Sequence, residues 1–147
     1  MWSASEVARV ADIAFAQKGK PYRFGAKPVL SEAEPGWFDC SGFVRWVIGQ
    51  GRDTNGRQII LPLGSFQQIE RCVAIARPPR VLDVGYFDSP NDDDDLVDHV
   101  ILKINDAQVI EARGKPHNAV ILRPIAKWEN QKGFMGWWTV NGIYESW

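Results

Sequence analysis

The sequence lacks the features that assign a chain to a membrane-bound or nucleic-acid-binding class. No apolar run approaches the length of a transmembrane helix, and the N-terminus has no basic segment followed by an apolar one, as a signal peptide would. The formal net charge of −1 over 147 residues gives no general attraction to nucleic acid or to an anionic membrane. We therefore expect no nucleic-acid partner, no membrane insertion, and a chain that is cytoplasmic, processed or delivered by other machinery.

Cysteine and histidine are also scarce. The two cysteines, Cys40 and Cys72, are too few for the disulfide framework of a small secreted module, although they could pair with each other. No CxxC or HxxxH pair accompanies the two histidines, so we predict no zinc site and no cofactor. The acidic run 91–95 lacks the alternating ligands and closing glutamate of a calcium loop. We expect a solvated loop there, or a negative rim that favours substrates with free amines.

The length and the 45% of hydrophobic residues predict one domain over residues 1–147 with a sizeable core. Helical spacing predicts helices at 5–18, behind a capping box at 3–6, at 40–48, and from a second capping box at 65–68 to residue 76. Short runs rich in β-branched residues follow at 81–87, 98–104, 108–112, 119–125 and 137–144. Helices followed by strands predict an α+β domain, with N-terminal helices packed on a C-terminal antiparallel sheet.

Cys40 is the candidate nucleophile. Asp39 before it is a good helix N-cap, and Ser41 and Gly42 after it are small enough to leave the sulfur uncovered. A thiol in the first turn of a helix is favoured as thiolate by the unpaired N–H groups and the macrodipole. Cys72 falls on the apolar face of the next predicted helix, so we expect it to be an inert core residue.

A cysteine nucleophile needs a histidine base, and the chain offers only His99 and His117. His99 opens a predicted strand, and Glu111 lies on the next one at an even separation along the chain. Because side chains alternate along a strand, these two share a face if the hairpin loop has an odd number of residues, as a loop of residues 105–107 does. Glu111 would then orient His99, as in a nucleophile–base–orienter triad. His117, in a turn-like segment, is the rival third member.

Three segments carry a resemblance to a known family. They are Pro21-Tyr22-Arg23-Phe24-Gly25, Phe38-Asp39-Cys40-Ser41-Gly42-Phe43 and Asp98-His99-Val100. Together they resemble the NlpC/P60 cysteine peptidases, over about residues 7–125. The resemblance implies a reduced papain-like α+β fold and hydrolysis of peptide bonds in the stem peptides of bacterial peptidoglycan, typically between D-glutamate and the diamino acid.

The resemblance also implies roles for individual residues. Cys40 is the nucleophile, His99 the base, and Glu111 stands at the third, orienting position. The hydroxyl of Tyr22 and the backbone N–H of Cys40 would hold the oxyanion. Asp39 and Ser41 fall where the family binds the free amino end of the stem peptide.

The sequence departs from the family at three places. Gly25-Ala26 stands where Gly-Gly is common, and Val81-Leu82-Asp83 replaces a more usual Pro-Gly-Asp turn. Glu111 stands where a histidine is frequent, and a carboxylate there should raise the pKa of His99. Arg113 either binds a substrate carboxylate or is a surface charge.

Other functions stay open at this stage. The same cysteine–histidine pair would serve a peptidoglycan amidase or an acyl transferase. A non-catalytic module that binds the cell wall or a partner is a further alternative, motivated by the four tryptophans near the C-terminus, Trp128, Trp137, Trp138 and Trp147. By the resemblance the site of action is the bacterial cell wall or periplasm, so the expected source is a phage-borne, injected or trimmed secreted domain.

Overall fold

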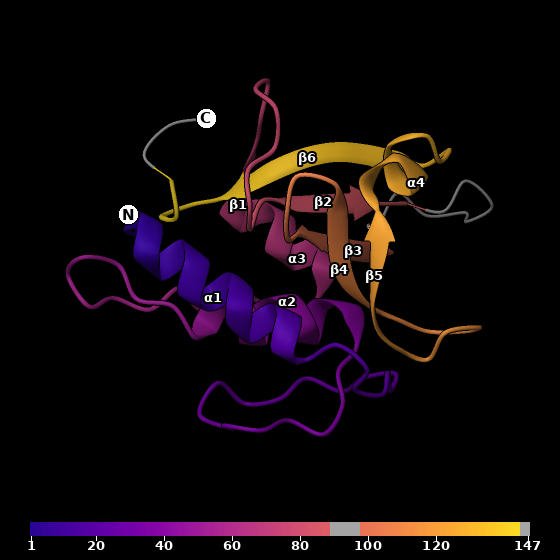
Figure 1. The fold of residues 1–147 in the computed structure, drawn as a ribbon, viewed down its shortest axis with the longest axis horizontal. Coiled ribbons are helices and arrows are strands. Elements are labelled where there is room, and N and C mark those ends of the chain that lie inside the picture. Colours follow the sequence, from indigo (N-terminus) through magenta and orange to yellow (C-terminus); the bar gives the residue numbers. More distant parts are fainter. Residues whose placement is uncertain (89–97, 145–147) are drawn as a thin grey trace.

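The computed structural model describes residues 1–88 and 98–144 (Figure 1). Its helices are α1 (Ala4–Ala16), α2 (Cys40–Gly49), α3 (Ser65–Gln68), the 3-10 helix η1 (Ile69–Arg71) and α4 (Ile125–Glu129). Its strands are β1 (Cys72–Ala74), β2 (Val84–Phe87), β3 (His99–Lys103), β4 (Gln108–Arg113), β5 (Ala119–Pro124) and β6 (Phe134–Val140). The predicted α+β class is confirmed. The acidic residues 92–95 and Trp147 lie outside the described residues.

Within the described residues, six strands form one antiparallel sheet in the order β1-β6-β2-β3-β4-β5. The helices α1 and α2 lie side by side below this sheet in Figure 1. Helix α2 packs against β3 and β4, which lie on the same part of the sheet. The start of α2 is therefore placed beside the strands that carry His99 and Glu111.

The first helix begins where its capping residue predicts. The Ser3 hydroxyl accepts a hydrogen bond from the backbone N–H of Glu6 at 3.1 Å, and Val7, Val10 and Ala14 are buried. Phe15 falls at helical spacing with these residues but is 46% exposed, and the Lys18 ammonium lies 5.1 Å from the centre of its ring. The buried face of α1 is therefore narrower than its periodicity predicts.

The prediction of a long helix over residues 65–76 is wrong. Helix α3 ends at Gln68, its N-cap is Gly64 rather than a serine, and residues 72–74 form strand β1 against Trp138–Val140 of β6. Pairing with the edge of β6 satisfies the backbone of this segment better than a helix whose sequence has no strong intrinsic preference. Cys72 is nevertheless buried in the core, as predicted.

The bounds of strands β2 and β6 differ from the prediction. Strand β2 starts at Val84 rather than at residue 81, because the residues just before Val84 form a turn. In this turn Leu82 adopts a left-handed backbone conformation with φ of 71°. The buried carboxylate of Asp83 holds this turn by accepting hydrogen bonds from Arg77 and from the backbone N–H of Arg80, both at 2.7 Å. Strand β6 runs over 134–140 rather than 137–144, and the short helix α4 was not predicted.

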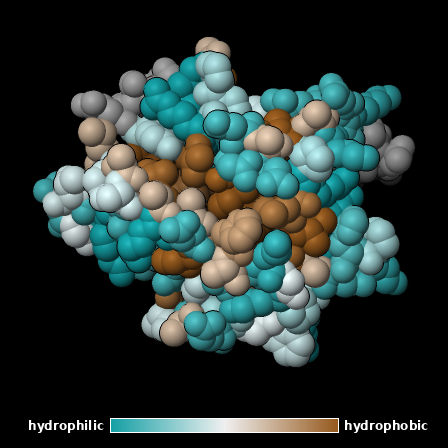
Figure 2. Space-filling model, viewed as in Figure 1, coloured by the Kyte–Doolittle hydropathy of each residue, from teal (hydrophilic) through white to brown (hydrophobic). Residues whose placement is uncertain are grey.

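Apolar side chains fill the space between helices and sheet. The larger cluster includes Val10, Phe38, Phe43, Val47, Leu82 and Ile110, and the smaller one holds Ile101, Val109, Trp128 and Trp137. Figure 2 shows hydrophobic residues across the middle of one face, surrounded by hydrophilic ones. The smaller cluster lies on the other side of the sheet from the larger one, as the alternation of Ile101 and Leu102 along β3 requires.

Replacement of Gly42 by alanine should destabilise the fold. A Cβ there would overlap the backbone carbonyl oxygen of Ala26 and lie 2.8 Å from a carboxylate oxygen of Asp39. We expect Gly42→Ala to lower the free energy of unfolding by about 1–3 kcal/mol, measured by urea denaturation. Gly36→Ala is the matched control, since a Cβ at Gly36 meets no atom within 4 Å. Equal stability of the two variants would contradict the tight packing of Ala26 and Lys27 on the first turn of α2.

Candidate active site

The thiol of Cys40 stands at the first position of α2. The carboxylate of Asp39 caps this helix by accepting a hydrogen bond from the backbone N–H of Gly42 at 2.6 Å. Cys40 is partly exposed, and neither it nor Cys72 forms a disulfide. Its sulfur lies 4.0 Å from the backbone carbonyl oxygen of Asp98, the residue that precedes His99. The helix therefore presents the thiol toward the start of β3.

A short backbone pairing with Phe38 holds Tyr22 near the start of α2. Tyr22 forms a bridge with Phe38, and the N–H of Arg23 donates to the Phe38 carbonyl oxygen at 3.0 Å. This pairing fixes the half-buried Tyr22 just ahead of the residues that start α2. Burial, and then the negative charges of Cys40 and Asp39, raise the pKa of the Tyr22 hydroxyl, so it stays a hydrogen-bond donor at neutral pH.

His99 and Glu111 meet across the β3–β4 hairpin. The Nε2 atom of His99 lies 3.0 Å from Oε1 of Glu111. The register pairs Leu102 with Ile110, and the backbone N–H of Ile104 donates to the carbonyl oxygen of Gln108 at 3.1 Å. Beyond this last hydrogen-bonded pair the turn holds three residues, 105–107, so the odd number that puts His99 and Glu111 on one face is present. Because Nε2 faces Glu111, the other ring nitrogen, Nδ1, is left to face the thiol.

The carboxylate of Glu111 is fully buried and accepts from three donors. Besides His99, the indole N–H of Trp128 donates to Oε2 at 2.6 Å, and the Arg113 guanidinium donates to Oε1 at 3.3 Å. Burial alone would raise the pKa of this carboxyl. The hydrogen bond and charge of His99, with smaller contributions from Trp128 and Arg113, outweigh burial and lower it. Glu111 is therefore ionised where it holds the imidazole.

Trp128 is a site residue that sequence reasoning missed. Its ring stacks on the His99 imidazole with centroids 5.2 Å apart and an interplanar angle of 28°. The guanidinium groups of Arg113 and Arg123 lie over the same indole at 5.0 and 5.2 Å. The indole is buried in the smaller core cluster, yet it also covers the His99 imidazole and donates to the Glu111 carboxylate. Only the tryptophan count in the C-terminal segment pointed to it.

The pKa of His99 is raised, as a carboxylate at position 111 predicts. Burial disfavours the imidazolium, but hydrogen bonds with Cys40 and Glu111 outweigh burial and raise the pKa to about 9. Because this value exceeds the unfolded value of about 6.5, the stabilisation from protonated His99 is complete below pH 6.5. It is lost as the pH rises through about 9. At neutral pH the site therefore holds an imidazolium beside the thiol.

The other candidate residues lie elsewhere or are already engaged. His117 is exposed in the turn after β4, while Glu111 is the residue bonded to His99. Arg113, a candidate for a substrate carboxylate, points to Glu111 and Trp128. Cys72 is buried, and burial raises the pKa of its thiol to about 11, which fits an inert core residue.

Asp39 and Ser41 flank Cys40, and both bind the ammonium of a lysine of the same chain. The ammonium of Lys27 donates to Oδ2 of Asp39 at 2.6 Å and to the Ser41 hydroxyl at 2.8 Å. Nothing in the sequence had suggested Lys27 as a neighbour of the site.

Among residues 1–88 and 98–144, no three His, Cys, Asp or Glu side chains are grouped so as to hold a metal ion. In the same part of the chain, no helix combines the length and the apolar character needed to span a membrane.

No protein-family model matches the chain, and no curated protein sequence matches it. Several solved structures nevertheless resemble it. A lipoprotein-like NLP/P60 protein from Staphylococcus aureus is 23% identical with a TM-score of 0.70, over 97% of this chain and 43% of that one. The peptidoglycan hydrolase RipB from Mycobacterium tuberculosis is 26% identical with a TM-score of 0.62, over 92% of this chain and 64% of that one.

A third solved structure, RipD from Mycobacterium tuberculosis, is described as a non-catalytic NlpC/p60 domain protein adapted to peptidoglycan binding. It is 17% identical with a TM-score of 0.61, over 90% of this chain and 95% of that one. This chain spans less than half the length of the staphylococcal protein and less than two thirds of RipB.

Replacement of Glu111 by glutamine should lower the pKa of His99. Glutamine keeps an acceptor for the imidazole but removes the negative charge that stabilises its protonated form. We expect a downward shift of about one pH unit or more, measured by NMR titration of the imidazole resonances. The exposed His117 serves as the internal reference. An unchanged His99 titration would show that the carboxylate does not control the protonation of His99.

Proposed function

This chain has the NlpC/P60 fold, and on that premise we propose that it is a cysteine peptidase that hydrolyses peptide bonds in bacterial peptidoglycan stem peptides. The scissile bond in this proposal is the one between D-glutamate and the diamino acid. One observation carries the proposal. The thiol of Cys40, at the start of α2, lies beside the His99 imidazole, and Nε2 on the other side of that ring is 3.0 Å from the buried carboxylate of Glu111.

The proposed reaction starts with the Cys40 thiolate and the His99 imidazolium. The sulfur attacks the carbonyl carbon, and the oxyanion accepts hydrogen bonds from the Cys40 backbone N–H and the Tyr22 hydroxyl. His99 then gives its proton to the leaving amine, and the C–N bond breaks to leave a thioester. The neutral imidazole takes a proton from water, whose oxygen attacks the thioester, and the acid product leaves as the thiolate reforms.

Glu111 and Trp128 act through His99 in this proposal. Glu111 fixes the ring orientation and the tautomer by accepting from Nε2. Trp128 blocks one face of the imidazole and keeps water from the carboxylate by donating its own N–H at 2.6 Å. Both are positioning residues, and neither touches the reacting atoms.

Replacement of Cys40 by alanine should abolish hydrolysis and leave the fold intact. Cys40 is only partly buried, and its removal takes away the nucleophile without disturbing the Asp39 cap. We expect the rate on purified peptidoglycan to fall by about 10³-fold or more, with released fragments identified by mass spectrometry. Cys72→Ala is the control for general loss of a thiol. Retained hydrolysis by Cys40→Ala would end the proposal.

The same fragments separate peptidase from amidase or acyl-transfer chemistry. A peptidase at the proposed bond leaves a shortened peptide on the sugar, whereas an amidase releases the whole stem peptide. Acyl transfer instead yields a fragment that carries an added amine-containing group.

A second candidate is a wall-binding module without catalysis, which the resemblance to non-catalytic RipD favours. The reactivity of the thiol discriminates between the two functions. If the protein is an enzyme, Cys40 should react with iodoacetamide at pH 7 much faster than Cys72, whose pKa is raised to about 11. Alkylation of the Cys40→Ala variant measures the contribution of Cys72. A slow Cys40, together with retained binding of peptidoglycan, would favour the binding module.

A further inference from the structure

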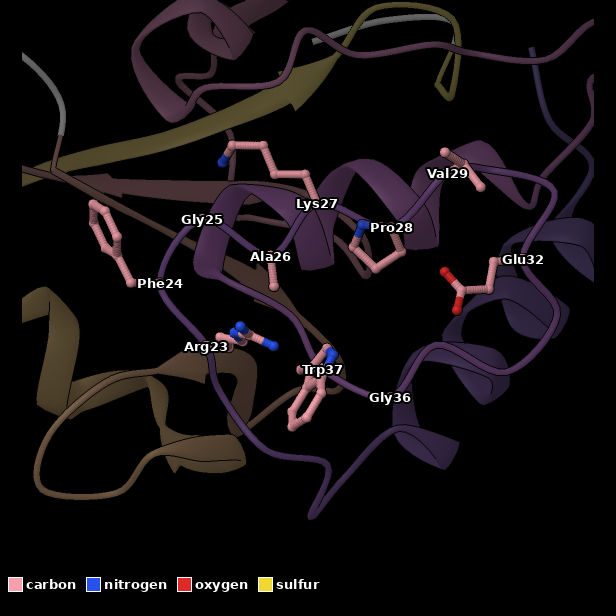
Figure 3. A pocket seen from close by; sticks show the side chains of 10 residues that line it. All are labelled: Arg23, Phe24, Gly25, Ala26, Lys27, Pro28, Val29, Glu32, Gly36 and Trp37. Carbon is pink, nitrogen blue, oxygen red and sulfur yellow. The ribbon is translucent and has the colours of Figure 1, made fainter.

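Lys27 connects a surface pocket with the start of α2. The pocket has a volume of about 530 Å³, and residues 23–29, 32, 36 and 37 line it. Residues 23–29 form a loop along the pocket, the pocket loop, and Figure 3 shows the Lys27 side chain extending from it past the first turn of α2. Its side chain is 27% exposed.

The Lys27 ammonium completes the hydrogen bonding of two buried polar groups next to the nucleophile. Oδ2 of Asp39 accepts from Lys27, and Oδ1 accepts from the Gly42 backbone N–H at 2.6 Å and from the Ser41 hydroxyl at 3.3 Å. The Ser41 oxygen also accepts from Lys27. A carboxylate and a hydroxyl placed in this way form an ammonium-binding site, and a side chain of the chain itself fills it.

The backbone holds Lys27 in this position. The Asp39 N–H donates to the Ala26 carbonyl oxygen at 2.8 Å, which ties the pocket loop to the residue before α2. Gly42 packs so closely against Ala26 and Lys27 that a Cβ added at position 42 would lie 3.0 Å from the Cα of Lys27. Movement of the ammonium away from Asp39 would therefore leave a buried carboxylate without its cation.

We propose that Lys27 makes this protein selective for peptides whose amino end is acylated rather than free. This inference rests on the proposed peptidase function and names its substrate class. A substrate ammonium at Asp39 and Ser41 would meet the like charge of Lys27 or have to displace it. An acyl carbonyl carries no charge, and its oxygen can accept a hydrogen bond from the third N–H of the Lys27 ammonium. The stem peptide is acylated in this way while an amide joins it to the sugar, so the protein acts on intact wall rather than on released peptides.

Matched synthetic peptides test this selectivity. Two stem peptides containing the D-glutamyl–diamino acid bond, one with an acetylated and one with a free amino end, are compared by kcat/KM. We expect the wild type to favour the acetylated peptide by about tenfold or more. Lys27→Met, which frees Asp39 and Ser41 for a substrate amine, should reverse this preference or reduce it to near one. Lys27→Arg keeps the charge and should retain the preference.

Lys20→Met is the control, since the Lys20 ammonium pairs with the exposed Glu34 at 3.4 Å. A wild type that prefers the free amine, or a ratio unchanged in Lys27→Met, overturns the selectivity proposal while hydrolysis itself stands. If Lys27→Met does not fold, the ratio of kcat/KM between the two peptides in the wild type decides whether the selectivity proposal holds. If the wild type cleaves neither peptide nor purified peptidoglycan, the proposed function fails, and the selectivity proposal fails with it.

Discussion

A carboxylate that folding removes from water has to be surrounded by hydrogen-bond donors, and this constraint shapes both halves of the site. On the sheet, Glu111 is surrounded by an imidazole, an indole and a guanidinium. On the helix, Asp39 is surrounded by a backbone N–H, a hydroxyl and an ammonium. Each donor is held in place by the carboxylate that it satisfies. The positions of the imidazole and of the thiol follow from these two clusters.

Core packing then brings the two clusters together. Helix α2 buries Phe43, Val44 and Val47 against strands that include β3 and β4, so its first turn cannot shift without opening the core. A site built on a helix and a sheet keeps its geometry better than one built on loops. The thiol and the imidazole belong to different elements, and the core between them sets their separation.

The fold is kept although the identity to the solved structures is 23%, 26% and 17%. Leu82 keeps a left-handed turn at a position where glycine is more usual in the resembling family, and its complete burial offsets the backbone cost. Lys27 places a positive charge beside Asp39. Fold depends on burial and on satisfied polar groups over the whole chain, whereas selectivity depends on a few charges near one atom.

The sequence by itself determined the parts of the site that follow from local rules. Asp39 and Gly42 define the start of a helix within four residues, and alternation requires His99 and Glu111 to share a face if the loop between them is odd, a condition that the register of β3 and β4 meets. Only the tertiary structure decided that residues 72–74 pair with β6, that Trp128 stacks on His99, and that Lys27 binds Asp39. Capping and alternation act over a few neighbouring residues and are legible in sequence. Contacts between distant segments depend on which arrangement of the whole chain buries the most apolar surface and satisfies the most polar groups, and no local pattern encodes that choice.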